Sequence, residues 1–544
     1  MKKSLWVIFA CVLALSLALS GCSSSSSSNG KEKDSGNSSS AGKGEDSDYV
    51  LIYGRGGDSD SLDPAMTTEG ESYNVTDSIY ENLVEFGKDN TDVQPGLAEK
   101  WDVSPDATKF TFHLKEGIKF HDGTDFNAEA VVKNFQRWAK SKDEAKFAYY
   151  PSMFGGFEGD EGHVIKEVKA IDEKTVEFTL NRPQAPFLKN LGMSPFAIAS
   201  PTAFEKGEDS LAKNPVGTGP FKFVSWKPND VIELERNDEY WQKGLPKLAG
   251  VKFKVIKDNS ARLNALIKGE LDVIDGLNPS DMSKVEADKN LALYERPSLN
   301  TAYLGFNVEK EPFNKKEVRQ AISHLINKEE IIKNFYEGTA ESATNPMPPS
   351  VSGYNDSIQD REYDVEKAKE LLKQAGLEKG FKLDLWALPI ARPYMPNGQK
   401  VAEALQADFK KANIDANIVT FEWGTYIDKL RAGEASMFMM GWNGDNGDAD
   451  NFLYTLLDKD TIGSNNYARY GNEEVHKLLI EAQSIADETK RNDLYKKAQE
   501  IIFEDAPWVP LAHSTPLLAG SSKVQGFVPH PTGSQSFIDV SVSK

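Results

Sequence analysis

Apolar and polar residues alternate along most of the chain in patterns that predict strands interleaved with helices. Four short runs have strand character: Tyr49–Tyr53, Phe110–Leu114, Phe381–Leu385 and Ile418–Phe421. Four stretches with helical spacing accompany them: Tyr73–Phe86, a segment that follows Asp364 and stops at Gly376, Val401–Ala412 and Tyr426–Leu430. Strands that alternate with helices predict an α/β protein with a parallel or mixed sheet and helical crossovers.

One stretch, Met437 to Phe452, combines a buried strand with a polar loop. Met437–Met440 is purely apolar, which predicts a strand buried on both faces, and Gly441 is expected to end it. The loop that follows carries one aromatic ring and three acids: Trp442, Asp445, Asp448 and Asp450. Ligands of open α/β sheets bind just past the carboxyl ends of strands, and a carboxylate beside an aromatic ring suits an ammonium group. The alternative is an acidic, solvated turn.

A second loop offers the opposite charge. Pro389–Asn397 follows the predicted strand Phe381–Leu385 and contains one cation, Arg392. An arginine fork grips a carboxylate through two parallel hydrogen bonds. The two loops together therefore favour a binding site over a solvated turn.

Composition bounds the class of protein. The 544 residues are 39% hydrophobic and 27% charged, which predicts large cores and more than one domain. The net charge is −20 and no Lys/Arg-rich run stands out, so we expect no nucleic-acid partner. The acidity indicates solubility, with a mild preference for cations.

The N-terminus has the order of a lipoprotein signal peptide. Lys2 and Lys3 precede an apolar run, Leu5–Leu19, that is shorter than the roughly 20 residues of a membrane span. Leu19-Ser-Gly-Cys22 resembles a bacterial lipobox, which implies cleavage after residue 21 and a lipid on the thiol of Cys22. The alternative is an ordinary signal peptide. Residues 22–48 are rich in serine and are expected to form a flexible tether.

Cysteine usage agrees with export. Cys11 and Cys22 are the only two cysteines, and cleavage removes the first. The exported chain would then contain no disulfide, thiol nucleophile or cysteine metal site.

Several motifs resemble a known family. Gly117–Gly123 and Phe126–Val131 follow the predicted strand at Phe110, and three more motifs come later: Asn214–Phe221, Asn237–Trp241 and Val318–Ile322. This order resembles the signature of the family 5 extracellular solute-binding proteins, the peptide-binding components of ABC importers. The resemblance runs from Tyr49 to the C-terminus. It is strongest to dipeptide-binding members, at Trp386–Tyr394, Glu422–Gly424 and Met439–Phe452.

The resemblance implies a two-lobe periplasmic-binding-protein-like α/β fold of class II, cluster C, with an extra N-terminal subdomain. It implies these boundaries: residues 49–75, 215–297 and 515–544 for lobe 1, 76–214 for the extra subdomain, and 298–514 for lobe 2. The crossovers Pro297–Asn300 and His513–Pro516 would form the hinge between the lobes.

The resemblance also implies a two-ended clamp. Arg392 would hold the carboxylate of a dipeptide and Asp445 its amino group. Two residues span at most about 7 Å and a third adds roughly 3.5 Å, so a fixed cation and a fixed anion measure length as well as charge. The alternative is that both are structural ions, paired with each other or with local partners.

Other residues are expected to complete the site. Trp442 and Gly441 would supply a wall and backbone hydrogen bonds, and Tyr394 would line the pocket. Gly70 matches a backbone contact from the opposite lobe in relatives, and Thr68 lies beside it. For Trp442, a place in the core is the alternative. Asp448 and Asp450 are expected to structure the loop.

The sequence therefore predicts a lipid-anchored, monomeric receptor that captures dipeptides and passes them to the permease subunits of an ABC importer. No H-E-x-x-H, G-x-S-x-G or G-x-x-x-x-G-K-[ST] motif is present, so we expect no enzyme. The seven histidines show no ligand spacing, so we expect no metal or other cofactor. Alternatives are a binding protein for oligopeptides, signalling peptides or glutathione, and a surface adhesin, co-receptor or peptidase. Distant relatives bind nickel chelates, haem or glutathione.

Overall fold

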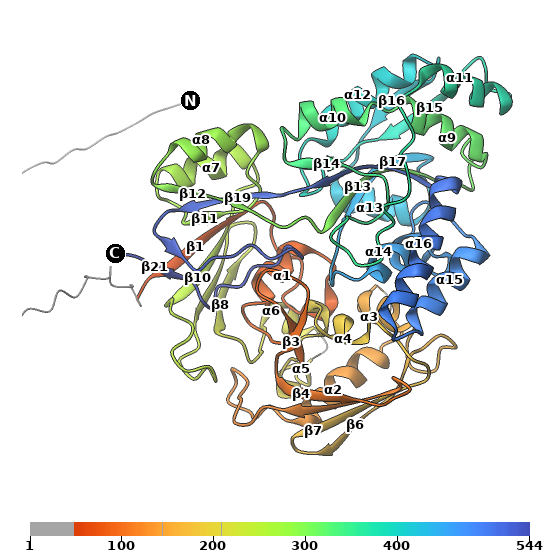
Figure 1. Cartoon of the computed structure of the whole chain (residues 1–544). Helices are drawn as coiled ribbons and strands as arrows, with labels where there is room; N and C mark the ends of the chain where they lie inside the picture. The colour runs from red at the N-terminus through yellow and green to blue at the C-terminus, as the bar shows by residue number, and fades with distance from the viewer. Residues whose placement is uncertain (1–47, 144, 208) are drawn as a thin grey trace, which may run out of the picture. The chain divides into compact units, whose positions relative to one another are not determined.

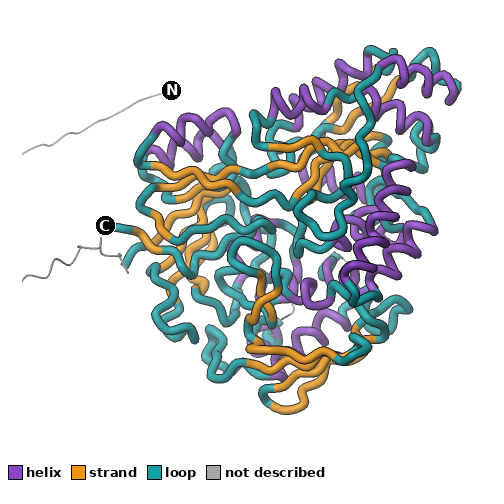
Figure 2. Tube along the Cα trace, in the orientation of Figure 1, coloured by secondary structure: helices purple, strands orange, loops and turns teal. Residues whose placement is uncertain are grey.

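The computed structural model describes residues 48–143, 145–207 and 209–544 (Figures 1 and 2). The predicted signal peptide, Cys22 and all of the predicted tether except Asp48 lie outside these residues. Within the described ranges, no helix has the length and apolar character that crossing a membrane requires.

A seven-stranded mixed sheet is assembled from three separated parts of the chain. Its strands lie in the order β12-β19-β11-β1-β10-β9-β8. Their bounds are β1 Val50–Arg55, β8 Phe221–Lys227, β9 Val231–Arg236, β10 Gly250–Val255, β11 Val273–Ile274, β12 Leu291–Glu295 and β19 Leu517–Ser521. The central strand β1 pairs in parallel with both β10 and β11. Helices α7 (Asn259–Ile267) and α8 (Met282–Ala287) lie beside β11, β12 and β19 of this sheet (Figure 1).

A six-stranded mixed sheet forms the second core, in the order β14-β18-β13-β17-β15-β16. Its bounds are β13 Asn300–Phe306, β14 Ala340–Ser342, β15 Lys382–Trp386, β16 Asp415–Val419, β17 Met437–Asn443 and β18 Trp508–Ser514. The helices of this part of the chain are α9 Lys316–Leu325, α10 Lys328–Phe335, α11 Val365–Gln374, α12 Gly398–Lys410, α13 Trp423–Arg431, α14 Ala449–Leu457, α15 Glu473–Gln483 and α16 Glu488–Asp505. Met437–Met440 is buried on both faces in the middle of this sheet, as predicted.

A third core surrounds a four-stranded antiparallel sheet, β4 Ala98–Val103, β5 Lys109–Leu114, β7 Thr175–Leu180 and β6 Ile165–Asp172. Helix α2 (Ala128–Ala139) packs on it, and the rings of Phe135 and Phe178 lie edge to face at 4.8 Å. The remaining elements of this part are α1 Gly70–Thr76, β2 Val84–Phe86, β3 Val93–Pro95, α3 Tyr149–Phe154, α4 Phe187–Leu191, α5 Pro201–Phe204 and α6 Ser210–Lys213. The two-stranded sheet β20 (Val524–Gln525) and β21 (Ser541–Val542) lies near the C-terminus.

Two connections lead from the seven-stranded to the six-stranded sheet, and they run side by side. One joins β12 to β13 and the other joins β18 to β19. The backbone N–H of Arg296 donates to the carbonyl of Pro516 at 2.9 Å, and Nδ2 of Asn300 donates to the carbonyl of Ser514 at 2.8 Å. These hydrogen bonds hold the two connections together where they leave the sheets.

The helix predicted over Tyr73–Phe86 is wrong beyond Thr76, where α1 ends. The backbone carbonyls of Ser78 and Ile79 accept hydrogen bonds from Phe221 and Gly219 instead of from the next helical turn. The apolar residues of this stretch are buried, so the spacing reflects burial against a distant segment rather than a helix. The strand predicted at Ile418–Phe421 is also displaced, because β16 ends at Val419.

Gly441 does not end its strand, contrary to expectation. Strand β17 continues to Asn443, and Gly441 pairs with Ala302 of β13. A Cβ at position 441 would collide with the ring of Tyr394 and lie 2.5 Å from the carbonyl oxygen of Thr301. The glycine therefore permits close packing inside the sheet.

Candidate functional site

The two loops that carry the predicted clamp leave the same edge of the six-stranded sheet. Strands β15 and β17 are neighbours and run parallel, with Leu385 opposite Met437 and Trp386 opposite Phe438. Parallel neighbours bring their carboxyl ends to one edge of a sheet. The loop with Arg392 and the loop with Asp445 consequently leave the sheet at the same edge, although β17 continues to Asn443 beyond the residue that lies opposite Trp386.

Asp445 is a carboxylate among neutral hydrogen-bond donors. Tyr149 of α3 donates its hydroxyl to Oδ1 at 3.0 Å, and Asn451 of α14 donates Nδ2 to Oδ2 at 3.0 Å. Asn451 also accepts the backbone N–H of Asp445 at 2.9 Å, which fixes the loop. No ion pair with Asp445 forms within the described part of the chain. Burial raises the pKa of Asp445 to about 6, although both hydrogen bonds lower it.

Arg392 is held by an aromatic ring and an acid. Its guanidinium carbon lies 3.9 Å from the centre of the Trp423 ring, a distance at which the ring attracts the cation. Its Nη2 lies 3.4 Å from Oε2 of Glu69, at the start of α1. The Arg392 side chain is 20% exposed, so the planar group is oriented but still accessible.

Three predicted residues connect the two charged groups. Tyr394 is buried two residues after Arg392, and its ring occupies the space in front of Gly441. Trp442, which follows Gly441 in the chain, is half-buried, and its Nε1–H donates a hydrogen bond to Oδ1 of Asn451 at 3.0 Å. Asn451 in turn holds Asp445, so packing and hydrogen bonds run from one end of the predicted clamp to the other.

Gly70 and Thr68 lie at the other side of the site. Both are exposed around the first turn of α1, and a Cβ at Gly70 would have no atom within 4 Å. Between them, Glu69 reaches Arg392. The structure thus brings Thr68 and Gly70 to the arginine end of the predicted clamp.

The structure identifies contacts that the sequence reasoning missed, at Glu69, Tyr149, Asn451 and Trp423. Glu69 stands between two predicted residues, and Trp423 lies in the Glu422–Gly424 motif, so each could have been marked for its charge or ring. Tyr149 carried no such signal, because its contact with Asp445 spans 296 residues.

The alternative of a direct Arg392–Asp445 pair is absent from the described residues, since each side chain has other partners. The expectation for the two other acids is confirmed. Asp448 caps α14 and pairs with Arg491 at 2.6 Å, and Asp450 accepts a hydrogen bond from Gln483 at 3.0 Å.

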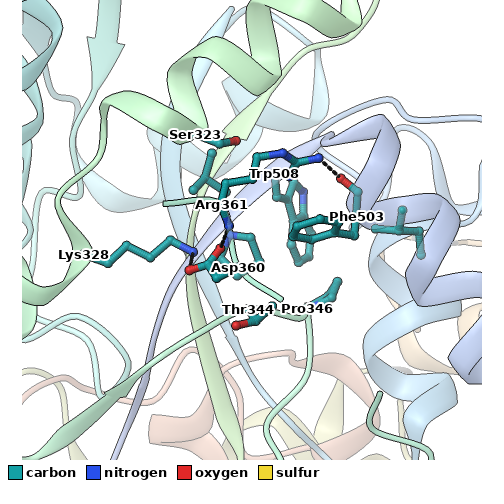
Figure 3. Close-up of a pocket in the computed structure, with 11 residues that line it drawn as sticks. Ser323, Lys328, Thr344, Pro346, Asp360, Arg361, Phe503 and Trp508 are labelled. Atoms are coloured by element: carbon teal, nitrogen blue, oxygen red, sulfur yellow. Dashed lines mark hydrogen bonds and ion pairs between the residues drawn. The ribbon is translucent and has the colours of Figure 1, made fainter. Parts of the chain in front are cut away.

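A cavity in the six-stranded part is too small for a peptide (Figure 3). Its volume is about 20 Å³, enough for a water molecule, whereas ligand pockets hold about 300–1,000 Å³. The buried Lys328 beside it pairs with Asp360 at 2.7 Å, and Arg361 donates to the carbonyl of Phe503 at 2.7 Å. None of the residues predicted for the clamp lines this cavity.

One histidine does meet two acids. Ligand atoms of Asp458, Asp460 and His476 lie within 4.8 Å of one another. Nδ1 of His476 is 3.0 Å from Oδ1 of Asp458, and that carboxylate also accepts the backbone N–H of Asp460. The group is thus explained as a hydrogen-bonded helix cap that joins α15 to the end of α14.

Comparison with known families extends these observations to the whole chain. The sequence model of the bacterial extracellular solute-binding proteins, family 5, matches residues 92–464, which is more than half of the chain. The dipeptide-binding protein of Escherichia coli K12 is 41% identical over 510 residues, covering 91% of this chain and 94% of that protein.

Two further relatives carry different ligand names. Heme-binding protein A of Haemophilus influenzae is 39% identical over 497 residues, covering 88% of this chain and 90% of that protein. A solved structure of an ABC transporter-associated periplasmic binding protein from Helicobacter pylori, in complex with the peptide STSA, is 39% identical. It superposes with a TM-score of 0.83 and covers 91% of this chain and 98% of that chain.

Proposed function

The chain belongs to the bacterial extracellular solute-binding proteins of family 5, and we propose that it captures dipeptides and delivers them to an ABC importer. As a member of this family it is a binding protein and not an enzyme, and its fold is the two-lobe α/β fold of the solved relatives. Its place is outside the cytoplasm, as the family description says.

The observation that carries the dipeptide proposal is the pair of opposite charges at one sheet edge. Arg392 and Asp445 follow neighbouring parallel strands, and a continuous set of contacts through Tyr394, Gly441 and Trp442 joins them. A dipeptide in neutral water carries one carboxylate and one ammonium, at a separation limited to about 7 Å by the length of two residues. The clamp therefore matches both charges of this ligand class.

The surroundings of Asp445 favour an ammonium as its partner. Tyr149 and Asn451 are neutral, so they leave the charge of the half-buried carboxylate without a counter-ion among the described residues. Burying a charge is costly unless it is paired. A ligand ammonium would supply the missing positive charge and add a hydrogen bond of roughly 1.5–3 kcal/mol.

We further propose the lobe boundaries given by the resemblance, with residues 297–300 and 513–516 as the hinge. All strands of the seven-stranded sheet fall in the ranges of lobe 1, and all strands of the six-stranded sheet fall in lobe 2. In this scheme, Glu69 and Tyr149 approach the clamp from lobe 1 and its subdomain, and they would close over a bound ligand.

The proposal includes a lipid anchor at Cys22 and a monomeric protein. A lipid chain with a serine-rich tether would keep the receptor beside its permease and leave it free to turn. Mass spectrometry of the mature N-terminus tests the anchor: an unmodified N-terminus would exclude it without affecting the binding proposal.

Calorimetry with blocked ligands tests the dipeptide proposal. We expect a dipeptide to bind at least about tenfold more tightly than its N-acetyl form, its C-terminal amide or a tripeptide, because each of these breaks one end of the clamp or its length. Mass spectrometry of the ligand that co-purifies with the protein provides an independent answer. Equal affinity for all four ligands, or co-purified haem, glutathione or a longer peptide, would contradict the proposal.

Binding should also depend on pH through Asp445. Its pKa of about 6 means that the carboxyl must lose a proton below that pH before an ammonium can pair with it. Affinity should therefore fall as the pH falls, by about tenfold between pH 7 and pH 5. Calorimetry in buffers of different ionisation enthalpy would measure the released proton. An N-acetyl dipeptide, which has no ammonium, should lack this dependence and provides the control.

A further inference from the structure

Glu69 places a second negative charge at the arginine end of the site. It precedes the first residue of α1, and its side chain makes no hydrogen bond to the helix N-terminus. Its carboxylate lies 3.4 Å from Arg392, and the contact joins residues 323 positions apart in the chain. The side chain is 36% exposed. Glu69 is therefore free of a capping role and faces the cation that the proposed function assigns to the ligand carboxylate.

The charge of Glu69 affects the pKa of tyrosines from both sides of the site. Burial has the largest effect on the pKa of Tyr73, Tyr149, Tyr394 and Tyr467, and the negative charge of Glu69 raises the pKa of all four further. The first two belong to the part of the chain that holds Glu69, and the last two belong to the six-stranded part. The charge of Glu69 therefore acts on aromatic side chains from both parts of the chain, while its own side chain is 36% exposed.

A dipeptide without a charged side chain leaves the charges at the arginine end of the site unbalanced. The ligand ammonium neutralises Asp445, which leaves Arg392 to serve two anions, Glu69 and the ligand carboxylate. Arg431, whose charge acts on Tyr467, lies 3.9 Å from a partner of its own, Asp428. Among these three groups one positive charge is missing, and partly buried charges are stable when they are paired. A further acid lies within range of Arg392, because burial raises the pKa of Glu71 to about 7 and the charge of Arg392 is among those that lower it.

We propose that Glu69 makes the site prefer dipeptides whose second residue carries a cationic side chain, that is, lysine or arginine at the C-terminal position. The side chain of that residue starts from the same Cα as the carboxylate bound by Arg392, so its cation is the group of the ligand that can reach Glu69. This inference rests on the proposed dipeptide function and names the ligand class within it.

Calorimetry with a matched set of dipeptides tests this preference. The probes are alanyl-lysine, alanyl-(Nε-acetyl)lysine, lysyl-alanine and alanyl-glutamate. We expect alanyl-lysine to bind about tenfold more tightly than its Nε-acetyl form, which keeps the aliphatic part of the side chain but carries no side-chain charge. We expect the side-chain charge of lysyl-alanine to increase the affinity less than that of alanyl-lysine does, because the lysine side chain then starts at the Asp445 end. Alanyl-glutamate should bind most weakly of the four.

Two substitutions separate a specificity role from a structural one. Glu69→Gln should reduce the preference for alanyl-lysine over its acetylated form to less than about twofold, and Glu69→Lys should invert the order so that alanyl-glutamate binds best. Asp493→Asn, which removes an exposed charge on α16, should leave the preference unchanged.

The outcomes are distinguishable from a failure of the proposed function. If no dipeptide binds, both the function and this preference are wrong. If all dipeptides bind with similar affinity, or if Glu69→Gln changes every affinity by the same factor, the function stands and the preference is wrong. If the contact between Glu69 and Arg392 is purely structural, Glu69→Gln should change every affinity by the same factor, and Glu69→Lys should not invert the order of the ligands.

Discussion

Replacing Asp445 by Ala should weaken dipeptide binding by about 2–5 kcal/mol, which is roughly 30- to 4,000-fold in affinity. In the proposed clamp, the substitution removes the acid that pairs with the ligand ammonium, and it leaves that ammonium beside Tyr149 and Asn451, which are neutral. Calorimetry with one dipeptide and its N-acetyl form measures the effect. The natural protein should discriminate strongly between them, and the variant should not.

The matched control for this substitution is Asp493→Ala, which removes an exposed acid from α16. It should bind like the natural protein. Asp445→Asn provides a second variant of nearly unchanged size, and it should also lose the discrimination. If Asp445→Ala still prefers the free amino group over the N-acetyl form, the ammonium is bound elsewhere and the clamp is wrong.

Replacing Arg392 by Lys should weaken binding by about 1.5–3 kcal/mol although the positive charge is kept. The loss follows from geometry, because a lysine ammonium cannot grip a carboxylate with two parallel hydrogen bonds. The guanidinium carbon also lies over the Trp423 ring, 3.9 Å from its centre, and this contact orients the group. Comparing a dipeptide with its C-terminal amide isolates the carboxylate end. Arg392→Lys should retain part of the discrimination, and Arg392→Ala should retain none.

Arg469→Lys is the control for this end of the site. Arg469 pairs with Glu309 at 2.6 Å beyond the other end of β13, away from the clamp. It should show no change in affinity for either ligand. Equal loss of affinity for the dipeptide and its amide in Arg392→Lys would mean that Arg392 shapes the site without holding the carboxylate.

Local signals in the sequence predicted individual elements well. Met437–Met440 is a central strand because an uninterrupted apolar run can be stable only where both faces are covered. Asp364 accepts hydrogen bonds from the backbone of Glu366 and Lys367 and begins α11, and Gly376 beyond its end has a φ of +79°. In each case the residues that decide the structure lie within a few positions of one another.

Features that depend on distant partners could not be predicted in this way. Residues 77–83 have helical spacing, but the carbonyls of Ser78 and Ile79 bind the segment around Gly219, and those of Asn82 and Leu83 bind residues 97 and 98. Gly441 looks like a strand breaker, yet the ring of Tyr394 needs the space beside it. The same reason explains why Arg392 and Asp445 were found while Glu69 and Tyr149 were missed. Arg392 and Asp445 lie in two loops that can be recognised in the sequence. Glu69 and Tyr149 are marked only by contacts with residues about 300 positions away in the chain.

The order of strands in the seven-stranded sheet constrains how the protein can be made. Strand β19, residues 517–521, lies between β11 and β12, although both of those strands are complete by residue 295. The sheet therefore stays split until almost the entire polypeptide has been synthesised and released. Pairing of such late and early segments is slow, because a long stretch of chain must close before any hydrogen bond forms. A polypeptide that must leave the cytoplasm benefits from this delay, since it remains incompletely folded while it is being translocated.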